Sequence, residues 1–238
     1  MKKIVGYIIC SVLLFSACSQ PKKTQKRNPF VTEICLKTTP VKDQGRSSLC
    51  WLYAMLATIE TNHLMQGDSV NLSTDYVARQ LLMESARRYY LSRGTTPINM
   101  RGMGTRLLTL IQTCGAVPFD AYHAYHPVNY NVVARKLQLA SRSTTNFNHL
   151  DSRANSILDE AIGYLPGPKV YMLGAAYTPL EFAHSVCQED EYQAITSFTH
   201  HPFGSHFVLE VPDNVNNDRV LNVPLDAMMQ FVVTRLRN

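Results

Sequence analysis

The sequence predicts an α+β fold, and two patterns along its 238 residues support this prediction. Apolar residues recur at helical spacing through the first two thirds of the chain, most clearly over residues 152–165. Short apolar runs typical of strands, 170–173 and 207–211, occur only in the last third. The composition, with 45% apolar and 17% charged residues, is that of a globular domain and excludes a mainly disordered chain.

The charge balance favours no nucleic-acid partner. The formal net charge of +5 falls to 21 − 18 = +3 without Lys2 and Lys3, and the remaining basic residues are spread thinly. The body of the chain contains no long apolar run, so a membrane bundle is also excluded.

The N-terminus has the pattern of an export signal. Lys2 and Lys3 precede an apolar run over residues 4–15, which is too short for a membrane span. The following Phe15-Ser16-Ala17-Cys18 resembles the lipobox of bacterial lipoproteins, and the polar, basic stretch after it is typical of a tether. The alternative is an ordinary secretory signal with an incidental cysteine.

The lipobox resemblance implies a lipoprotein signal peptide over residues 1–17, a lipid anchor on Cys18 and a tether over residues 18–30. Residues 31–238 would form the folded domain. The protein would be anchored in a bacterial cell envelope, facing the periplasm or the exterior.

Four helices are predicted before the last third. The segment 48–66 has apolar residues on nearly every face, so we expect a buried helix, capped by Ser47 or Ser48 and ended by Gly67. The others are 74–91 after a Ser73 cap, 105–114 before Gly115, and 152–165 before the break at 166–168.

The last third predicts two further helices. Thr178 and Pro179 form a cap and first-turn proline, and Pro224 opens the final helix. One face of that final helix is apolar, through Leu225, Met228, Met229, Val232, Val233 and Leu236. Such a stripe requires a packing partner.

The cysteine pattern indicates neither zinc nor a thioredoxin-like site, because no two cysteines have CxxC spacing. With Cys10 removed and Cys18 lipidated, the remaining cysteines are Cys35, Cys50, Cys114 and Cys187. Two disulfides among these four are one possibility in an exported protein. No metal or organic cofactor is expected.

The chemistry is predicted to centre on the segment 40–54, where Cys50 lies in the first turn of an apolar helix. Free backbone N–H groups and the helix dipole favour a thiolate at that position, and the thiolate is the nucleophilic form. Gln44 precedes Cys50 by six residues, across a turn at Gly45, and its amide could donate to a developing oxyanion. The alternative is a buried structural cysteine.

The same segment resembles papain-like cysteine peptidases, whose pattern after Pro-Val is Gln-Gly-x-Cys-Gly-Ser-Cys-Trp. The Gln44-to-Cys50 spacing, Gly45 and the Cys50-Trp51 pair match this pattern. Ser47 replaces a disulfide cysteine of the family, and Ser48-Leu49 replaces Gly-Ser. The run Cys-Trp-Leu-Tyr-Ala at 50–54 is closest to the bleomycin hydrolase and aminopeptidase C branch.

Further similarities to this branch follow in order along the chain, at 71–76, 102–122, 177–183, 195–203, 207–214 and 222–226. The resemblance implies a papain-like fold, mainly its helical half with an incomplete β-barrel half. It also implies peptide cleavage, of aminopeptidase type, through a Cys50 acyl-enzyme, with Gln44 as the second catalytic residue.

The catalytic base is the open part of this interpretation. His206 and Asn222 have nearly the family's His-to-Asn separation, but Asn222 lies in an Asn-Val-Pro-Leu-Asp context that precedes the catalytic histidine in the aminopeptidase C branch. We therefore expect His206 to lie beyond hydrogen-bond reach of Cys50, and an exposed apolar patch around the final helix. The other histidines, including His123, His126, His200 and His201, are expected in loops.

Two functions thus stay open for this sequence. The first is a cysteine-type aminopeptidase acting on peptides. The alternative is a catalytically inactive, truncated homologue that binds peptides or is completed by a complementing chain or by oligomerisation.

Overall fold

The computed structural model describes residues 30–172 and 174–237, which belong to two structural units. Residues 30–35 belong to the first unit, where they are exposed and form no helix or strand. The second unit begins at Leu36 and contains helices and small sheets, so the predicted α+β class is confirmed. The predicted signal peptide, the Cys18 anchor and the tether up to residue 29 lie outside the described residues.

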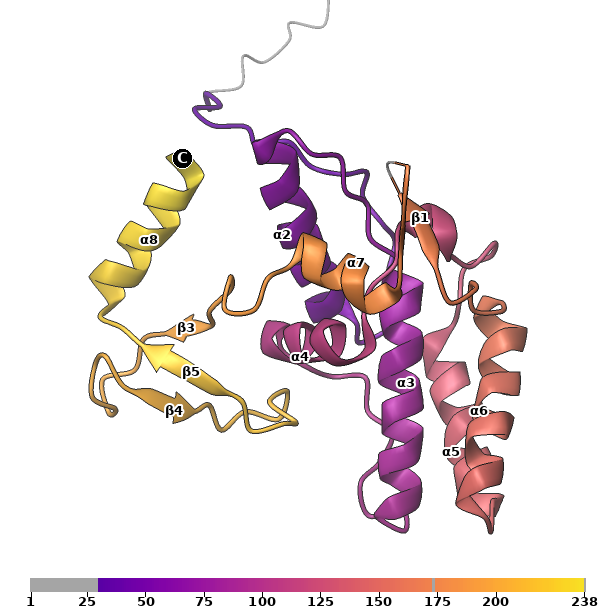
Figure 1. Cartoon of the computed structure of the whole chain (residues 1–238). Helices are drawn as coiled ribbons and strands as arrows, with labels where there is room; N and C mark the ends of the chain where they lie inside the picture. Colours follow the sequence, from indigo (N-terminus) through magenta and orange to yellow (C-terminus); the bar gives the residue numbers. More distant parts are fainter. Residues whose placement is uncertain (1–29, 173, 238) are drawn as a thin grey trace, which may run out of the picture. The chain divides into compact units, whose positions relative to one another are not determined.

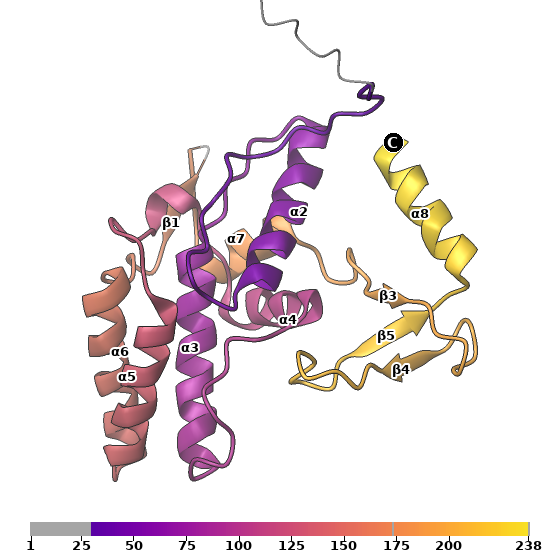
Figure 2. The ribbon, with the colours of Figure 1, turned by 180° about the vertical axis from the view of Figure 1, so that it is seen from behind.

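Helices make up most of the second unit (Figure 1). In chain order they are α2 (Cys50–Gln66), α3 (Thr74–Leu91), α4 (Gly104–Cys114), the short η1 (Phe119–Ala121), α5 (Tyr130–Ser143), α6 (Phe147–Ile162), α7 (Pro179–Val186) and α8 (Leu225–Arg237). Helices α3, α5 and α6 pack side by side, and α4 contacts α2, α3 and α7 (Figure 2).

The strands in the described part of the chain are short and form two separate sheets. Antiparallel β1 (Val170–Met172) and β2 (Ala175–Tyr177) form one, with Val170 opposite Tyr177. The other has the order β3-β5-β4, from β3 (Ile195–Thr196), β4 (His206–Val208) and β5 (Arg219–Asn222). Central β5 is parallel to β3 and antiparallel to β4. The predicted strand at 207–211 is therefore real but begins and ends earlier.

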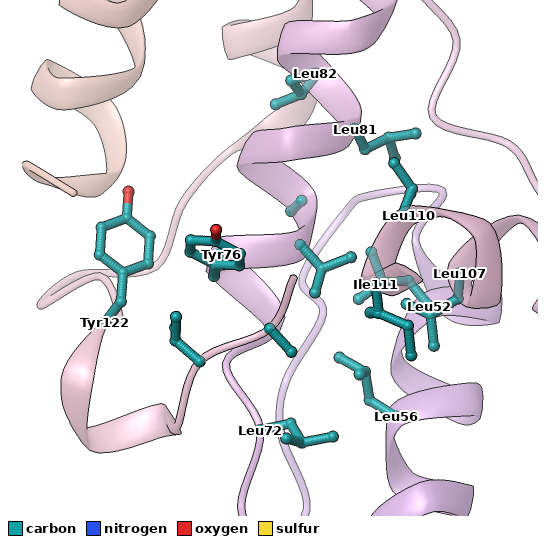
Figure 3. Close-up of a cluster of buried hydrophobic side chains, with 14 of the residues drawn as sticks. Leu52, Leu56, Leu72, Tyr76, Leu81, Leu82, Leu107, Leu110, Ile111 and Tyr122 are labelled. Carbon is teal, nitrogen blue, oxygen red and sulfur yellow. The ribbon is translucent and has the colours of Figure 1, made fainter. Parts of the chain in front are cut away.

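The hydrophobic core is one cluster that runs from Leu49 to Cys187 and joins the helices from α2 to α7. Figure 3 shows its centre, where Leu52 and Leu56 of α2 and Ile111 of α4 face residues of α3. After Cys187, only Val220 and Val223 are buried apolar residues among those described, and neither belongs to the cluster. The core thus positions α2, which carries Cys50.

Two of the predicted helix starts are confirmed in atomic detail. The Ser73 side chain accepts a hydrogen bond from the Tyr76 N–H at 3.0 Å and caps α3. Thr178 and Glu181 form a reciprocal capping box at the start of α7, with Pro179 in the first turn. These starts were predictable because a cap requires only residues that are close in sequence.

The predicted cap of α2 is wrong. Leu49 occupies the N-cap position of α2, and no side chain caps this helix. Leu49 is fully buried, so packing determines where the helix begins. The prediction that α2 is buried on nearly every face is also wrong, since its buried residues are Leu52, Leu56, Ile59 and Glu60, while Ala54 and Ala57 are exposed.

Helix α5 was not predicted, and α6 begins five residues earlier than expected. The first turn of α5 contains β-branched Val132 and Val133, which have low helix propensity, and its packing against α3 and α6 compensates. Helix α6 is capped by Asn146 rather than beginning at Ser152. Leu165, expected in this helix, lies beyond it and is exposed.

Helix α8 exposes its apolar stripe, as the sequence predicted. Leu225, Met229, Val232, Val233 and Leu236 are each between 43% and 57% exposed. No other helix in the described part of the chain lies alongside α8 (Figures 1 and 2). Among the described residues, no helix has the length and apolar character required to cross a membrane.

Candidate functional site

Cys50 is the first residue of α2 and is exposed to solvent. The preceding Leu49 is fully buried, and its carbonyl accepts the N–H groups of Leu52 and Tyr53 at 2.9 and 3.1 Å. The N–H groups of Cys50 and Trp51 lie before the first intrahelical bond and have no backbone partner among the described residues. These groups carry the partial positive charge of the helix N-terminus, and the Cys50 side chain lies beside them.

Trp51 fixes the orientation of this helix turn. Its indole Nε1–H donates to the carbonyl of Met100 at 2.8 Å. Gly102 packs against the same ring, because a Cβ at this position would lie only 2.7 Å from the indole atoms. The Cys50-Trp51 pair is therefore anchored through the tryptophan, while the cysteine stays accessible.

Gln44 lies on the loop before α2, in a turn that Gly45 makes possible with φ +58°. Its amide Nε2 donates to the Ser47 carbonyl at 3.5 Å, and the Ser47 hydroxyl donates to the Gln44 carbonyl at 2.8 Å. No hydrogen bond joins Gln44 to Cys50 in the described part of the chain. The hydrogen bond from the Gln44 amide to the Ser47 carbonyl is at the long limit for such a bond, so little opposes rotation of this side chain toward a ligand.

A network around Glu60 joins this loop to α2, and sequence reasoning missed it. Glu60 is 1% exposed and accepts from Lys42 Nζ at 2.5 Å, from the Leu72 N–H at 2.6 Å and from the Thr39 hydroxyl. Lys42 also donates to the Leu72 carbonyl at 2.8 Å. The available signal was Glu60 itself, the one acidic residue of α2, together with a lysine two residues before Gln44.

The loop also lines a cavity of 490 Å³ that contains Gln44 but not Cys50. Asp75 lies in this cavity and accepts from the Ala124 N–H at 2.8 Å and from the Tyr130 hydroxyl. Burial, reinforced by Asp75, holds the pKa of Tyr130 well above its ordinary value. Burial likewise raises the pKa of Tyr53, so both tyrosines stay neutral.

The structure brings neither His206 nor Asn222 to Cys50. His206 Nε2 lies 2.9 Å from Nε2 of Gln193 and forms no hydrogen bond with Cys50. Asn222 is fully buried and donates to the carbonyls of Phe198 and His201 at 2.9 and 2.8 Å. Its Oδ1 accepts from the Phe198 N–H at 2.8 Å, so this side chain holds a loop rather than a histidine.

The other predicted residues have separate environments. His201 stacks on Phe207 with ring centroids 3.8 Å apart, and His123 stacks on Phe119 at 4.5 Å.

Cys35, Cys50, Cys114 and Cys187 are free thiols, so the structure contains neither of the two possible disulfides among them. Burial raises the pKa of the Cys187 thiol to about 11, which keeps it protonated at neutral pH.

The sequence matches no protein-family model and no curated protein. The papain-like interpretation therefore rests on the motif residues of this chain, of which the structure places Cys50 and Gln44 within one helix start and its preceding loop.

Proposed function

We propose that this protein is a papain-like cysteine peptidase, of aminopeptidase type, in which Cys50 is the nucleophile. The observation that carries the proposal is the exposed thiol at the first residue of a 17-residue helix, next to two free N–H groups. An anchored helix N-terminus with an accessible cysteine is an arrangement typical of nucleophilic cysteines.

In the proposed reaction the Cys50 thiolate attacks the carbonyl carbon of a peptide bond. A carbon–sulfur bond forms, the carbon–nitrogen bond breaks, and the leaving amine takes up from solvent the proton that the Cys50 thiol gave up on ionisation. Water then hydrolyses the thioester and regenerates the thiol. The Gln44 amide and the Cys50 N–H would donate to the oxyanion that develops in each step.

A second candidate function is favoured by the environment of His206. This histidine contacts Gln193 rather than Cys50, and the described part of the chain gives Cys50 no hydrogen-bonded base. The alternative is an inactive homologue that binds peptides, or one whose base comes from a complementing chain. The exposed stripe of α8 would suit such a partner.

The test is release of a fluorescent amine from aminoacyl and dipeptidyl coumarin amides by the full chain. A peptidase releases the amine, Cys50→Ser abolishes release, and Gln44→Ala lowers turnover by about a hundredfold or more, the usual cost of losing one oxyanion donor. Cys114→Ser serves as the matched control and keeps the wild-type rate.

The inactive alternative predicts a different result. The full chain then binds peptides without cleaving them, and Cys50→Ser binds equally well. Release that persists in Cys50→Ser contradicts the proposed nucleophile, and absence of both cleavage and binding contradicts both functions.

A further inference from the structure

The 490 Å³ cavity beside Gln44, which we call the Gln44 cavity, has two carboxylates in its wall. Asp43 accepts from a backbone N–H at 2.8 Å. Asp75 accepts from the Ala124 N–H at 2.8 Å and from the Tyr130 hydroxyl, and both of these partners line the same cavity. All of these donors are uncharged, and neither carboxylate forms an ion pair within the described residues. The wall therefore carries negative charge without a matching cation.

The lysine in this wall does not neutralise the two carboxylates. Lys42 is the only lysine or arginine among the described residues that line the cavity. Its Nζ donates to Glu60 at 2.5 Å and to the Leu72 carbonyl at 2.8 Å. Because buried Glu60 offsets the charge of Lys42, the charges of Asp43 and Asp75 stay unmatched.

The two carboxylates act on the same part of the cavity, at the hydroxyl of Tyr53. Burial is the largest cause that raises the pKa of Tyr53, and a hydrogen bond with Thr74 partly opposes it. The negative charges of Asp75 and Asp43 both raise this pKa further. An electrostatic potential that disfavours a phenolate favours a cation at the same place.

The rest of the lining is largely apolar or aromatic, which favours an organic cation. A lysine or arginine side chain has an apolar stem that packs on such surface and a charged head that carries the hydrogen-bond donors. Aromatic rings also attract a guanidinium or ammonium group. The cavity volume of 490 Å³ lies within the range of about 300–1,000 Å³ that is usual for ligand pockets. The lining includes Tyr53, Phe119, Pro127, Val128 and Tyr130.

We propose that the Gln44 cavity binds the basic side chain, arginine or lysine, of a peptide ligand, with its charged head beside the carboxylates of Asp43 and Asp75. The inference rests on the proposed function for one statement only, that this peptide is the substrate. Gln44 joins the two, because it lines the cavity and its amide would donate to a peptide carbonyl. A side chain next to that carbonyl reaches the cavity readily, since neighbouring Cα atoms are only about 3.8 Å apart.

The first test measures binding without catalysis. The full chain, in detergent at constant ionic strength, is titrated calorimetrically with Nα-acetylarginine amide and with Nα-acetylcitrulline amide, which has the same shape without the charge. We expect millimolar binding of the arginine probe and at least tenfold weaker binding of the citrulline probe. A pH of 8 lies above the usual titration range of histidine, which limits any contribution from His126 at the exposed rim of the cavity.

Three variants locate the preference for charge. Asp75→Asn should weaken binding of the arginine probe at least tenfold, and Asp43→Asn severalfold, because solvent screens the exposed Asp43. The matched control is Asp120→Asn, which removes an exposed carboxylate beside Phe119 that does not line the cavity. This control should bind both probes as the wild type does.

A thermal measurement separates lost binding from a folding defect. The arginine probe should raise the melting temperature of the wild type and of Asp120→Asn but not that of Asp75→Asn, because a ligand that binds the folded state stabilises it. If Asp75→Asn does not fold, Asp43→Asn still tests the proposal. Asp43 is exposed, and the asparagine oxygen can keep its hydrogen bond from the Gly45 N–H.

The second test asks whether the peptide is a substrate. Matched peptides carry arginine or citrulline on either side of the scissile bond, and mass spectrometry of the products gives kcat/KM for each. At one of these positions arginine should raise kcat/KM about tenfold in the wild type, and Asp43→Asn should reduce this difference.

The two tests fail in different ways. Arginine binding without cleavage of any peptide would refute the proposed peptidase and keep the ligand of the cavity. Cleavage at equal rates for the arginine and citrulline peptides, equal binding of the two probes, or a preference that persists in both Asp75→Asn and Asp43→Asn would overturn the assignment of the cavity.

Discussion

Helices α6 and α8 both carry an apolar stripe at helical spacing, but only α6 buries it. Ala154, Leu158 and Ile162 of α6 are at most 4% exposed, because α3 and α5 cover this face. In α8, Met229 and Val232 are 53% and 48% exposed. Two similar sequence patterns therefore have different surroundings, and the difference lies in what the rest of the chain supplies.

This contrast extends to the regions around the two helices. The segment from α2 to α7 shares one hydrophobic core, whereas the three-stranded sheet contributes only Val220 and Val223 as buried apolar residues after Cys187. The sheet is held to its neighbouring loop by polar contacts, such as the hydrogen bonds from Asn222 to the carbonyls of Phe198 and His201. Stability is thus expected to be concentrated in the helical region.

The largest expected effect tests this contrast directly. Leu158→Ala in α6 should lower the free energy of unfolding by about 3–4 kcal/mol, since it leaves a cavity at a fully buried site. Met229→Ala in α8 should change it by less than about 0.5 kcal/mol. Urea denaturation followed by circular dichroism measures both. An equally large loss in Met229→Ala would mean that the stripe of α8 is covered in solution.

The second prediction concerns the polar anchor of the helical region. Glu60→Gln should cost about 2–3 kcal/mol, because it leaves Lys42 without its anion, although the new amide can still accept from the Leu72 N–H. The control is Glu160→Gln, whose partner Lys136 is half exposed and whose loss should cost less than about 0.5 kcal/mol. Equal effects in the two variants, measured by denaturation, would contradict the role of Glu60.

The third prediction compares cysteines at opposite helix ends. Cys50 begins α2, whereas Cys114 is the last residue of α4, so the two thiols lie at opposite ends of helix dipoles. Iodoacetamide should label Cys50 about tenfold faster than Cys114 at pH 7.5, and faster than exposed Cys35. Peptide mass spectrometry of samples taken over time measures each rate. Equal labelling of all cysteines would refute the activation of Cys50.

The same labelling experiment, repeated at several pH values, tests the raised pKa of the Cys187 thiol. Burial, with a smaller contribution from Glu191, raises its thiol pKa to about 11, so its thiolate fraction is very small at neutral pH. Labelling of Cys187 in the folded protein should be the slowest of the four and should increase as the pH rises toward 11. Rapid labelling at pH 7.5 would show that this cysteine is accessible and unperturbed.

The smallest expected effect concerns the exposed stripe itself. Wild-type protein should bind a hydrophobic dye such as anilinonaphthalene sulfonate, and Val232→Glu should reduce the fluorescence by interrupting the patch. Leu139→Glu is the control, because Leu139 is an exposed leucine on α5, outside the stripe of α8. If both variants reduced the signal equally, the dye would not be reporting on α8.

Local signals predicted the elements that local chemistry decides. The Ser73 cap, the Thr178–Glu181 capping box and the ends of helices at Gly67 and Gly115 involve residues only a few positions apart. Where packing decides, the prediction was wrong or incomplete. Helix α2 begins at buried Leu49 without a side-chain cap, and α5 forms despite weak propensity in its first turn.

The candidate site divides in the same way. That Cys50 lies in the first turn of a helix, and that Gly45 turns the chain before it, followed from the sequence. The sequence did not predict three contacts of the site. The Gln44 amide donates to the nearby Ser47 carbonyl, which is one of several carbonyls within its reach. The contact of His206 with Gln193 and the ion pair of Glu60 with Lys42 depend on partners from other parts of the chain.

The sequence alone determined the α+β class, most helix starts and ends, and the position of Cys50 at a helix N-terminus, because these depend on spacing and on neighbouring side chains. Only the tertiary structure decided which apolar stripes are buried and where Glu60 and Asn222 find their hydrogen bonds. The physical reason is that burial and hydrogen bonding between distant residues depend on which surfaces the folded chain brings together.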